Sequence, residues 1–540
     1  MTLAAGTDTT SHNDAGVANA ARVGAVMLLI IPAVLGGYVA GGALHDPDTC
    51  WLLALGRWIL EHGRLPQTDP FSYTYALFWG GQPVVLYQWL SELIFFVAYK
   101  LTALPGLLAL SSVTMVVAFY ALPVRILCRC GLGLAPAAGL ALLMVLTASF
   151  HFLVRPEIFS YLLAAVWIER LTATNSLASD KFDWRQTLLF FALTIIWCNL
   201  HSGFVFGLIL LSVSVLSSLG VALSSRCRGS RINLTALAAL AASLVATLIN
   251  PWGIGLWGYL PRLFFPAFNH YIVELKPVTI PDLGNPIFWP YLVLMGTALF
   301  IAAGARTAAA RTGLICGTSS LILALAGLFC RRLVPFAALF ILAGLSFMLA
   351  ASSKDKKAPA SGDGQLHPGG QFLNKIDAHL QDVIAPQSGR WLFGASLMAV
   401  LGTLLMSYLI IPPQLPQGSA VFQPPVQAIN FLTSSAPAGK VLNDAQFGDV
   451  MIWHLSPCPP VFLDTRFDMY GDKLVADYQT MTSGVGNWRE LLAQYRISWA
   501  FLNPECALVK ELERQQPWHV IYRDNAAVIL SRVYEKTVKD

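Results

Sequence analysis

The chain has 540 residues, of which 56% are hydrophobic and only 12% are charged. A soluble protein of this length needs more charge to cover its surface. The net charge of +5 is small and is spread over several loops, without the basic face and interleaved aromatic residues typical of nucleic-acid binding. The composition therefore indicates an integral membrane protein and gives no case for a nucleic-acid partner.

Long apolar runs divide the chain into expected spanning helices and polar loops. Residues 1–21 are polar and rich in small residues, which predicts a disordered cytoplasmic tail. A helix needs about 20 apolar residues to cross a hydrocarbon core about 30 Å thick. A further apolar segment, 86–103, carries Glu92 and Lys100. About eleven spans are expected, near 23–44, 105–124, 132–150, 157–171, 186–200, 203–224, 232–249, 286–304, 312–330, 334–351 and 392–412.

Basic residues determine the expected orientation, because loops rich in Lys and Arg stay on the cytoplasmic side. Five such loops share that side if the N-terminus is cytoplasmic and segment 86–103 lies along the outer surface or re-enters the membrane. If the segment crosses, most basic loops move outside. We prefer the first arrangement, with a cytoplasmic N-terminus. It places the first outer loop, 45–85, and the C-terminal domain on the extracytoplasmic face. The expected location is the inner (plasma) membrane of the cell.

The predicted fold class is mainly α: a polytopic transmembrane helix bundle with a small C-terminal α/β domain. The transmembrane core covers 22–351, and residues 352–391, rich in Gly, Pro, Lys and Ser, predict a cytoplasmic linker. The last span, 392–412, leads into the domain at 413–540, where Cys458 and Cys506 could form a disulfide. A helical segment is expected at Val421–Phe431, and short strands at Val441–Asn443, Val461–Asp464, Trp499–Leu502 and Val520–Tyr522.

The first outer loop opens with an acidic pair, Asp46 and Asp48. One carboxylate can accept a proton from an attacking hydroxyl, and its partner can orient it or bind a metal. Alternatively, the pair caps the helix that follows, since Asp before a helix satisfies free backbone N–H groups. That helix, over Leu52–Leu60, is predicted to be amphipathic and to lie in the membrane interface. Its apolar face would hold Trp51, Leu55, Trp58 and Ile59.

Two further polar clusters are expected near the outer membrane edge. Arg155 and Glu157 flank Pro156 at the start of a span. They fit either a capped helix start, in which Glu favours the first turn, or a binding role. His201 lies in a turn with almost no polar spacer between two spans, where polar groups need partners. It is a candidate for binding phosphate or a hydroxyl, or a hydrogen-bonded structural histidine.

A pair of arginines, Arg331 and Arg332, interrupts the expected distribution of positive charge. Guanidinium groups bind phosphate by bidentate hydrogen bonds, so the pair could hold a lipid-linked phosphate. Alternatively, it anchors the chain at the interface. Glu274 and Lys276, in an outer loop, are expected to pair with each other or to line the same cavity.

With these motifs in order, the chain resembles the GT-C glycosyltransferase superfamily. It is similar in particular to bacterial multi-pass proteins related to the aminoarabinose transferase of lipid A and the protein mannosyltransferases. One departure is Cys50-Trp51-Leu52, where such relatives often have Trp-Trp-His after the acidic pair. The resemblance rests on Asp46-Pro47-Asp48, Trp58–Tyr73, Gln88-Trp89-Leu90-Ser91-Glu92, Arg155-Pro156-Glu157, Asn199-Leu200-His201, Asn250-Pro251-Trp252-Gly253 and Asn443–Tyr470.

The resemblance implies an inverting transfer of a sugar from a polyprenyl-phosphate donor to a lipid, glycan or protein acceptor in the cell envelope. Asp46 or Asp48 would be the base, and a divalent cation, if one is used, would bind to the same pair. The alternatives are a transporter or flippase of a lipid-linked or small polar solute, and a non-catalytic envelope scaffold. A transporter should show internally related halves, which the sequence does not display.

Overall fold

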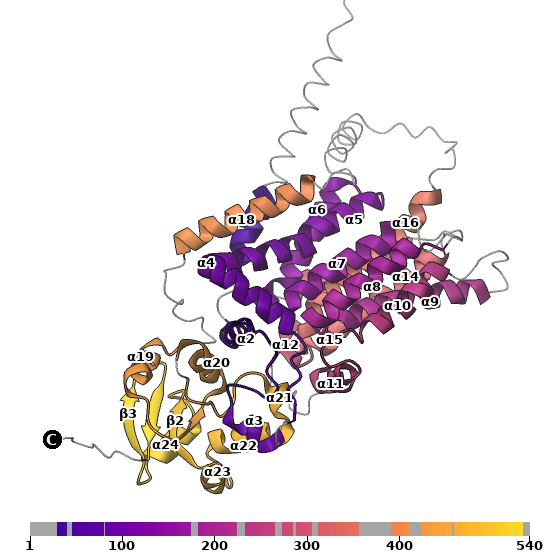
Figure 1. Cartoon of the computed structure of the whole chain (residues 1–540). Coiled ribbons are helices and arrows are strands. Elements are labelled where there is room, and N and C mark those ends of the chain that lie inside the picture. The colour runs from indigo at the N-terminus through magenta and orange to yellow at the C-terminus, as the bar shows by residue number, and fades with distance from the viewer. Residues whose placement is uncertain are drawn as a thin grey trace, which may run out of the picture.

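The computed structural model describes residues 30–39, 46–79, 82–173, 182–223, 233–264, 273–283, 288–304, 311–355, 390–410, 424–455 and 458–532. Within these residues the chain forms a bundle of apolar helices and a smaller domain of helices and strands at one end of the bundle (Figure 1). The predicted tail, 1–21, and most of the predicted linker, 352–391, lie outside the described residues.

The helices of the bundle follow the apolar runs of the sequence. Two of them begin at residues that satisfy free backbone N–H groups: Asp183 accepts from the N–H of Arg185, and Asn233 from that of Ala236. The helices comprise residues Ile30–Val39, α4 (Trp89–Val116), α5 (Leu122–Arg129), α6 (Leu134–Ala148), α7 (Glu157–Ala173), α8 (Trp184–Leu200), α9 (Phe204–Leu223), α10 (Leu234–Ala246), α13 (Trp289–Gly304), α14 (Arg311–Ala324), α15 (Ala326–Phe329), α16 (Val334–Asp355) and α18 (Arg390–Ile410).

Four of the described helical stretches are long and apolar enough to cross a membrane: Trp89–Arg129, Leu134–His151, Phe204–Leu223 and Arg331–Ala350. Other apolar helices among the described residues are shorter, between 10 and 17 residues. A mainly helical protein with helices long and apolar enough to span a membrane is thus confirmed, whereas the count of eleven spans and their orientation stay predictions.

Segment 86–103 is the first half of a bent helix. α4 begins at Trp89 and runs on into the next apolar run, with a break where Thr102 (φ −143°) and Ala103 (φ 56°) leave helical geometry. Gly106 permits this break, because a Cβ there would lie 1.7 Å from the Thr102 hydroxyl oxygen. The segment is therefore continuous with the predicted span at 105–124, and its placement relative to the membrane stays a prediction.

The helix after the acidic pair, α2 (Asp48–His62), forms as expected but is not amphipathic in the predicted sense. Its residues from Thr49 to Gly56 are all buried, because α2 packs against α4 on one side and against α20 (Ala445–His454) on the other. The first turns of α2, which are buried on all sides, are held by protein rather than by an interface. The prediction of an interfacial face through Trp51, Leu55, Trp58 and Ile59 was wrong, because the C-terminal domain covers this helix.

The C-terminal domain contains, in its described part, a sheet of order β1-β2-β4-β3. β1 and β2 are parallel, and the other neighbours are antiparallel. The α/β prediction is confirmed, although the last strand was not predicted, and Cys458 and Cys506 are free thiols. The strands are β1 (Lys440–Asn443), β2 (Ile497–Leu502), β3 (His519–Arg523) and β4 (Val528–Ser531), with helices α19 (Val426–Ser435), α20, α21 (Phe467–Tyr470), α22 (Asp472–Ser483), α23 (Trp488–Gln494) and α24 (Ala507–Glu513).

The predicted strand Val461–Asp464 forms only an isolated bridge with Ser72. Its residues are buried, but side chains satisfy its backbone: the Asn443 amide accepts from the N–H of Phe462 and donates to the carbonyl of Leu463. Buried backbone groups need partners, and side chains serve as well as a strand. A buried apolar run was therefore misread as a sheet strand.

The described residues of loop 45–85, the predicted first outer loop, pack into the C-terminal domain. α3 (Tyr73–Trp79) lies beside α21, as the purple helix among the yellow elements in Figure 1 shows. The Tyr73 hydroxyl donates to the carbonyl of Val441 (2.9 Å), and Asp69 pairs with Arg466 at 2.8 Å. Parts of the chain separated by almost 400 residues thus pack together next to α2.

Candidate active site

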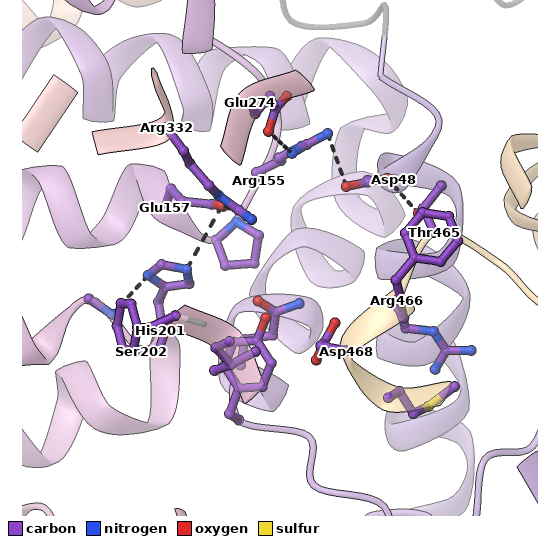
Figure 2. Close-up of a pocket in the computed structure, with 18 of the residues that line it drawn as sticks. Asp48, Arg155, Glu157, His201, Ser202, Glu274, Arg332, Thr465, Arg466 and Asp468 are labelled. Atoms are coloured by element: carbon purple, nitrogen blue, oxygen red, sulfur yellow. Dashed lines mark hydrogen bonds and ion pairs between the residues drawn. The ribbon is translucent and has the colours of Figure 1, made fainter. Parts of the chain in front are cut away.

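A cavity of about 680 Å³ lies where α2, the start of α7, the turn before α9, the helix α11 (Gly255–Phe264) and the segment around α21 come together. Figure 2 shows charged side chains from both the bundle and the C-terminal domain converging on it. Seven of the eight residues predicted from the sequence line this cavity: Asp46, Asp48, Arg155, Glu157, His201, Glu274 and Arg332.

Arg155 joins three of these carboxylates. Its Nε and Nη2 both donate to Asp46, Nη2 at 3.0 Å, and Nη2 also lies 3.1 Å from Asp48 Oδ2. Nη1 donates to Glu274 Oε2 at 3.2 Å. Bidentate pairing of this kind is strong and fixes direction. Both oxygens of Asp46 are engaged by Arg155, so Asp46 is not placed to accept a proton from a substrate.

Within the acidic pair, Asp48 is the more accessible carboxylate. One oxygen faces Arg155, the other accepts a hydrogen bond from the Thr465 hydroxyl at 2.6 Å, and 18% of the side chain is exposed. Burial raises the pKa of Asp48 to about 7, with Arg155 opposing the rise and Asp46 adding to it. A carboxylate whose pKa lies near neutral pH is suited to general-base chemistry. The capping alternative is weak, since only the N–H of Asp48 reaches Asp46 Oδ1, at 3.3 Å.

Glu274 pairs with Arg155 rather than with Lys276, and it also lies 3.8 Å from His151 Nε2. Burial raises the pKa of Glu274, but the charges of Arg155, His151 and Arg332 outweigh burial and lower it to about 2. Glu274 is therefore an ionised residue that orients Arg155, not a proton acceptor near neutral pH.

A second group on the cavity wall centres on Glu157, the first residue of α7. Arg332 Nη2 donates to Glu157 Oε1, and His201 Nε2 lies 4.0 Å from the same oxygen. The Arg332 side chain remains 35% exposed. Guanidinium has five N–H donors, so an anion in the cavity can bind to Arg332 while Glu157 holds it in place.

The hydrogen bonds of His201 define its tautomer. Its Nδ1 accepts from the N–H of Gly203 at 3.1 Å, and the Ser160 hydroxyl lies 2.9 Å from the same nitrogen. A backbone N–H only donates, so Nδ1 carries no proton and Nε2 carries it, facing Glu157. Burial lowers the pKa of His201 to about 4. His201 is therefore a neutral hydrogen-bond donor that has structural partners and also lines the cavity, and its role in binding stays a prediction.

Arg331, the eighth predicted residue, is not among the described residues that line the cavity. Its Nη2 pairs with Asp282 at 2.5 Å. The adjacent positions in the 3₁₀ turn Arg331–Leu333 point in different directions, so only Arg332 reaches the cavity. The prediction that both arginines grip one anion is therefore not supported for Arg331.

Several cavity residues were not predicted as site residues from the sequence. Thr465 and Asp468 line the cavity and belong to the block Asn443–Tyr470 of the C-terminal domain, which contributed only to the family resemblance. Asp468 accepts from the Tyr259 hydroxyl at 2.7 Å, and the Tyr259 ring lies 5.9 Å from that of Tyr87. No local sequence pattern could have joined these positions, because they lie on three elements far apart in the chain.

The acidic pair does not fit the metal site that the sequence left open. Within the described part of the chain, no group of three or more His, Cys, Asp or Glu side chains is arranged to hold a metal ion. The Arg155 guanidinium occupies the position between Asp46 and Asp48 that a cation would need. We therefore derive no step through a metal.

Comparison with known proteins gave matches only among solved structures; no family model and no curated protein matches the chain. Two of those structures are of ArnT from Cupriavidus metallidurans, one bound to undecaprenyl phosphate and one in the apo state. Each is 15% identical and covers 95% of this chain and 98% of that chain, with TM-scores of 0.49 and 0.48.

Proposed function

We propose that this protein is a membrane glycosyltransferase that moves a sugar from a polyprenyl-phosphate donor to an extracytoplasmic lipid, glycan or protein acceptor. The observation that supports the proposal is the shared cavity: Asp48, a carboxylate whose pKa burial raises to about 7, lines the same cavity as the donors Arg332 and His201. An acceptor hydroxyl needs a carboxylate to take its proton, and a leaving phosphate needs hydrogen-bond donors to stabilise its charge.

The reaction that this arrangement fits is a direct displacement. The acceptor hydroxyl gives its proton to Asp48 while its oxygen forms a bond to the anomeric carbon. The bond between that carbon and the phosphate oxygen breaks, and the configuration inverts. The departing polyprenyl phosphate carries the negative charge toward the Arg332 guanidinium and the Nε2–H of His201.

The test compares two adjacent arginines and the proposed base in the full-length protein reconstituted in nanodiscs. Arg332→Gln should weaken binding of undecaprenyl phosphate about 10-fold, the loss expected for one charge-assisted contact. Arg331→Gln is the matched control, because its partner is Asp282 and it does not line the cavity. It should change binding less than about 2-fold.

Transfer is measured with polyprenyl-phosphate sugars, radiolabelled in the sugar and extracted from host membranes. Asp48→Asn should bind the lipid normally and lose transfer by about 100-fold or more, since removal of a general base costs about 10²–10⁴-fold. If Asp48→Asn transfers at the unmodified rate, the proposal is wrong. Movement of the lipid between leaflets without transfer would favour the flippase alternative.

A further inference from the structure

The C-terminal domain contributes a buried hydrogen-bonded chain that ends on Asp48. The Thr465 hydroxyl oxygen lies 2.6 Å from Asp48 Oδ1 and 2.9 Å from Asp449 Oδ2. The N–H of Thr465 donates to the other oxygen of Asp449 at 3.2 Å. The three residues come from α2, α20 and the segment before α21, so this chain exists only when the domain is seated on the bundle.

The number of protons in this chain is constrained by simple chemistry. A hydroxyl has one hydrogen and can donate to only one of the two carboxyl groups. The other carboxyl must then be a carboxylic acid that donates to the Thr465 oxygen, or two lone pairs would face each other in a buried site at 2.9 Å. One of the two aspartates in contact with Thr465 must therefore carry a proton.

The surroundings decide which aspartate carries it. Asp48 faces Arg155 at 3.1 Å and is partly exposed to the cavity, with Asp46 and Glu274 as the other nearby charges. Asp449 is fully buried, and the charged groups that face it are Asp48 and Asp464. Burial first, and these two carboxylates second, raise the pKa of Asp449 well above its ordinary value. The proton belongs on Asp449.

Local structure holds the chain rigidly. A Cβ at Gly448 would lie 2.3 Å from the carbonyl oxygen of Leu463, so glycine is what lets α20 approach this segment closely enough for Asp449 to reach Thr465. Asn443 clamps the same segment through hydrogen bonds of 2.7 Å to Phe462 and Leu463. Cys50, next to these groups in α2, keeps its thiol proton because burial raises its pKa.

We propose that Asp449 is a protonated carboxylic acid and that, through the Thr465 hydroxyl, it fixes Asp48 as an oriented carboxylate. Thr465 and Asp449 are thus positioning residues supplied by the C-terminal domain. The direction of donation runs from Asp449 to Thr465 and from Thr465 to Asp48. That the oriented carboxylate acts as a base rests on the proposed function, whereas the hydrogen-bonded chain does not.

The chain is tested first without any activity. Infrared spectra of the purified full-length protein and of its variants are recorded at about pH 9, and each variant's spectrum is subtracted from that of the unmodified protein. This pH is roughly two units above the pKa of Asp48 of about 7, so Asp48 is ionised. The carboxylic-acid C=O band of Asp449 should be present in the unmodified protein and missing in Asp449→Asn. It should shift in Thr465→Val, which removes its acceptor. An Asp449→Asn spectrum identical to that of the unmodified protein would overturn the proposal.

The positioning role is tested by the pH dependence of sugar transfer. Thr465→Val removes a hydrogen bond that stabilises the ionised form of Asp48. The pH at which transfer falls to half its maximum on the acid side (the acid limb) should therefore rise by about one unit, and kcat should fall about 10-fold. Thr465→Ser should restore both. Asp449→Leu keeps the Thr465 hydroxyl but removes the donor that orients it, so it should change both quantities in the same direction by less than Thr465→Val, and Asp449→Asn should rescue, because its amide donates as the acid does. An Asp449→Asn enzyme as impaired as Asp449→Leu, or a Thr465→Val enzyme with an unmoved limb, would refute the assignment.

These outcomes separate the two proposals. If Asp48→Asn leaves transfer intact, the proposed function fails, and the infrared band alone decides whether Asp449 is protonated. If Asp48→Asn abolishes transfer but Thr465→Val and Asp449→Leu leave the pH dependence of transfer unchanged, the function stands and the positioning role fails.

Discussion

The ion pair between the first outer loop and the C-terminal domain offers the sharpest test of how this site is assembled. Arg466 is 6% exposed and holds two fully buried carboxylates. It donates to Asp69 at 2.8 Å, and to Asp464 at 2.9 Å through Nε and 2.5 Å through Nη2. Its guanidinium also lies over the rings of Trp51 and Phe71.

Arg466→Met keeps most of the packing volume and removes the charge. Two buried carboxyl groups then lose their partner, which costs about 3–5 kcal/mol when one member of a buried pair is removed. For a domain of about 100 residues, this lowers the thermal midpoint by more than about 10 °C. Asp69→Asn should cost less, about 1–2 kcal/mol, because Arg466 keeps Asp464 and the new amide oxygen still accepts from the N–H of Ser72.

Thermal unfolding of the full-length protein in nanodiscs, followed by tryptophan fluorescence, measures these midpoints. Arg489→Met is the control, since Arg489 is 59% exposed and only 3.9 Å from Glu511. A surface pair of this kind contributes about 0–1 kcal/mol. If Arg466→Met and Arg489→Met shift the midpoint equally, the buried pair does not hold the loop to the domain, and the reasoning fails.

Two further predictions concern the cavity itself. Gly203→Ala places a Cβ 2.3 Å from the Ser160 hydroxyl oxygen, so it should destabilise the protein by about 1–3 kcal/mol. Gly220→Ala is the control, because nothing lies within 4 Å of a Cβ at that position. Equal thermal unfolding midpoints for the two variants would contradict the packing argument. Sugar transfer should rise with pH and reach half its maximum near pH 7, because only the ionised form of Asp48, with its pKa raised to about 7, accepts a proton. His201, with its pKa lowered to about 4, stays neutral and adds no second limb between about pH 5 and 8; a flat rate over that range would contradict the assignment of Asp48.

The charges in the cavity explain why a single basic group cannot be assigned to the substrate from the sequence. Several carboxylates and arginines line this cavity, and the two arginines that were predicted as site residues and line it are already paired: Arg155 with Asp46, Asp48 and Glu274, and Arg332 with Glu157. Arg155 is fully used in organising carboxylates, whereas Arg332 stays partly exposed. The two have the same side chain, and burial and partners alone make one an orienting group and the other a candidate anion-binding group.

The sequence by itself determined the class of protein and most of the helices, because apolar run length and capping residues act over short distances. It also brought attention to seven of the residues that line the cavity, since charged side chains near long apolar runs are rare. It could not assign different roles to Asp46 and Asp48, or to Arg331 and Arg332, because residues so close in the sequence have the same local sequence around them. Only the tertiary structure distinguished their roles, because it pairs Arg155 with Asp46 and Asp282 with Arg331, and brings the Thr465 hydroxyl within hydrogen-bonding distance of Asp48. The interfacial face predicted for α2 was wrong for the same reason: an element more than 370 residues away in the chain covers it, and no local period records such a partner.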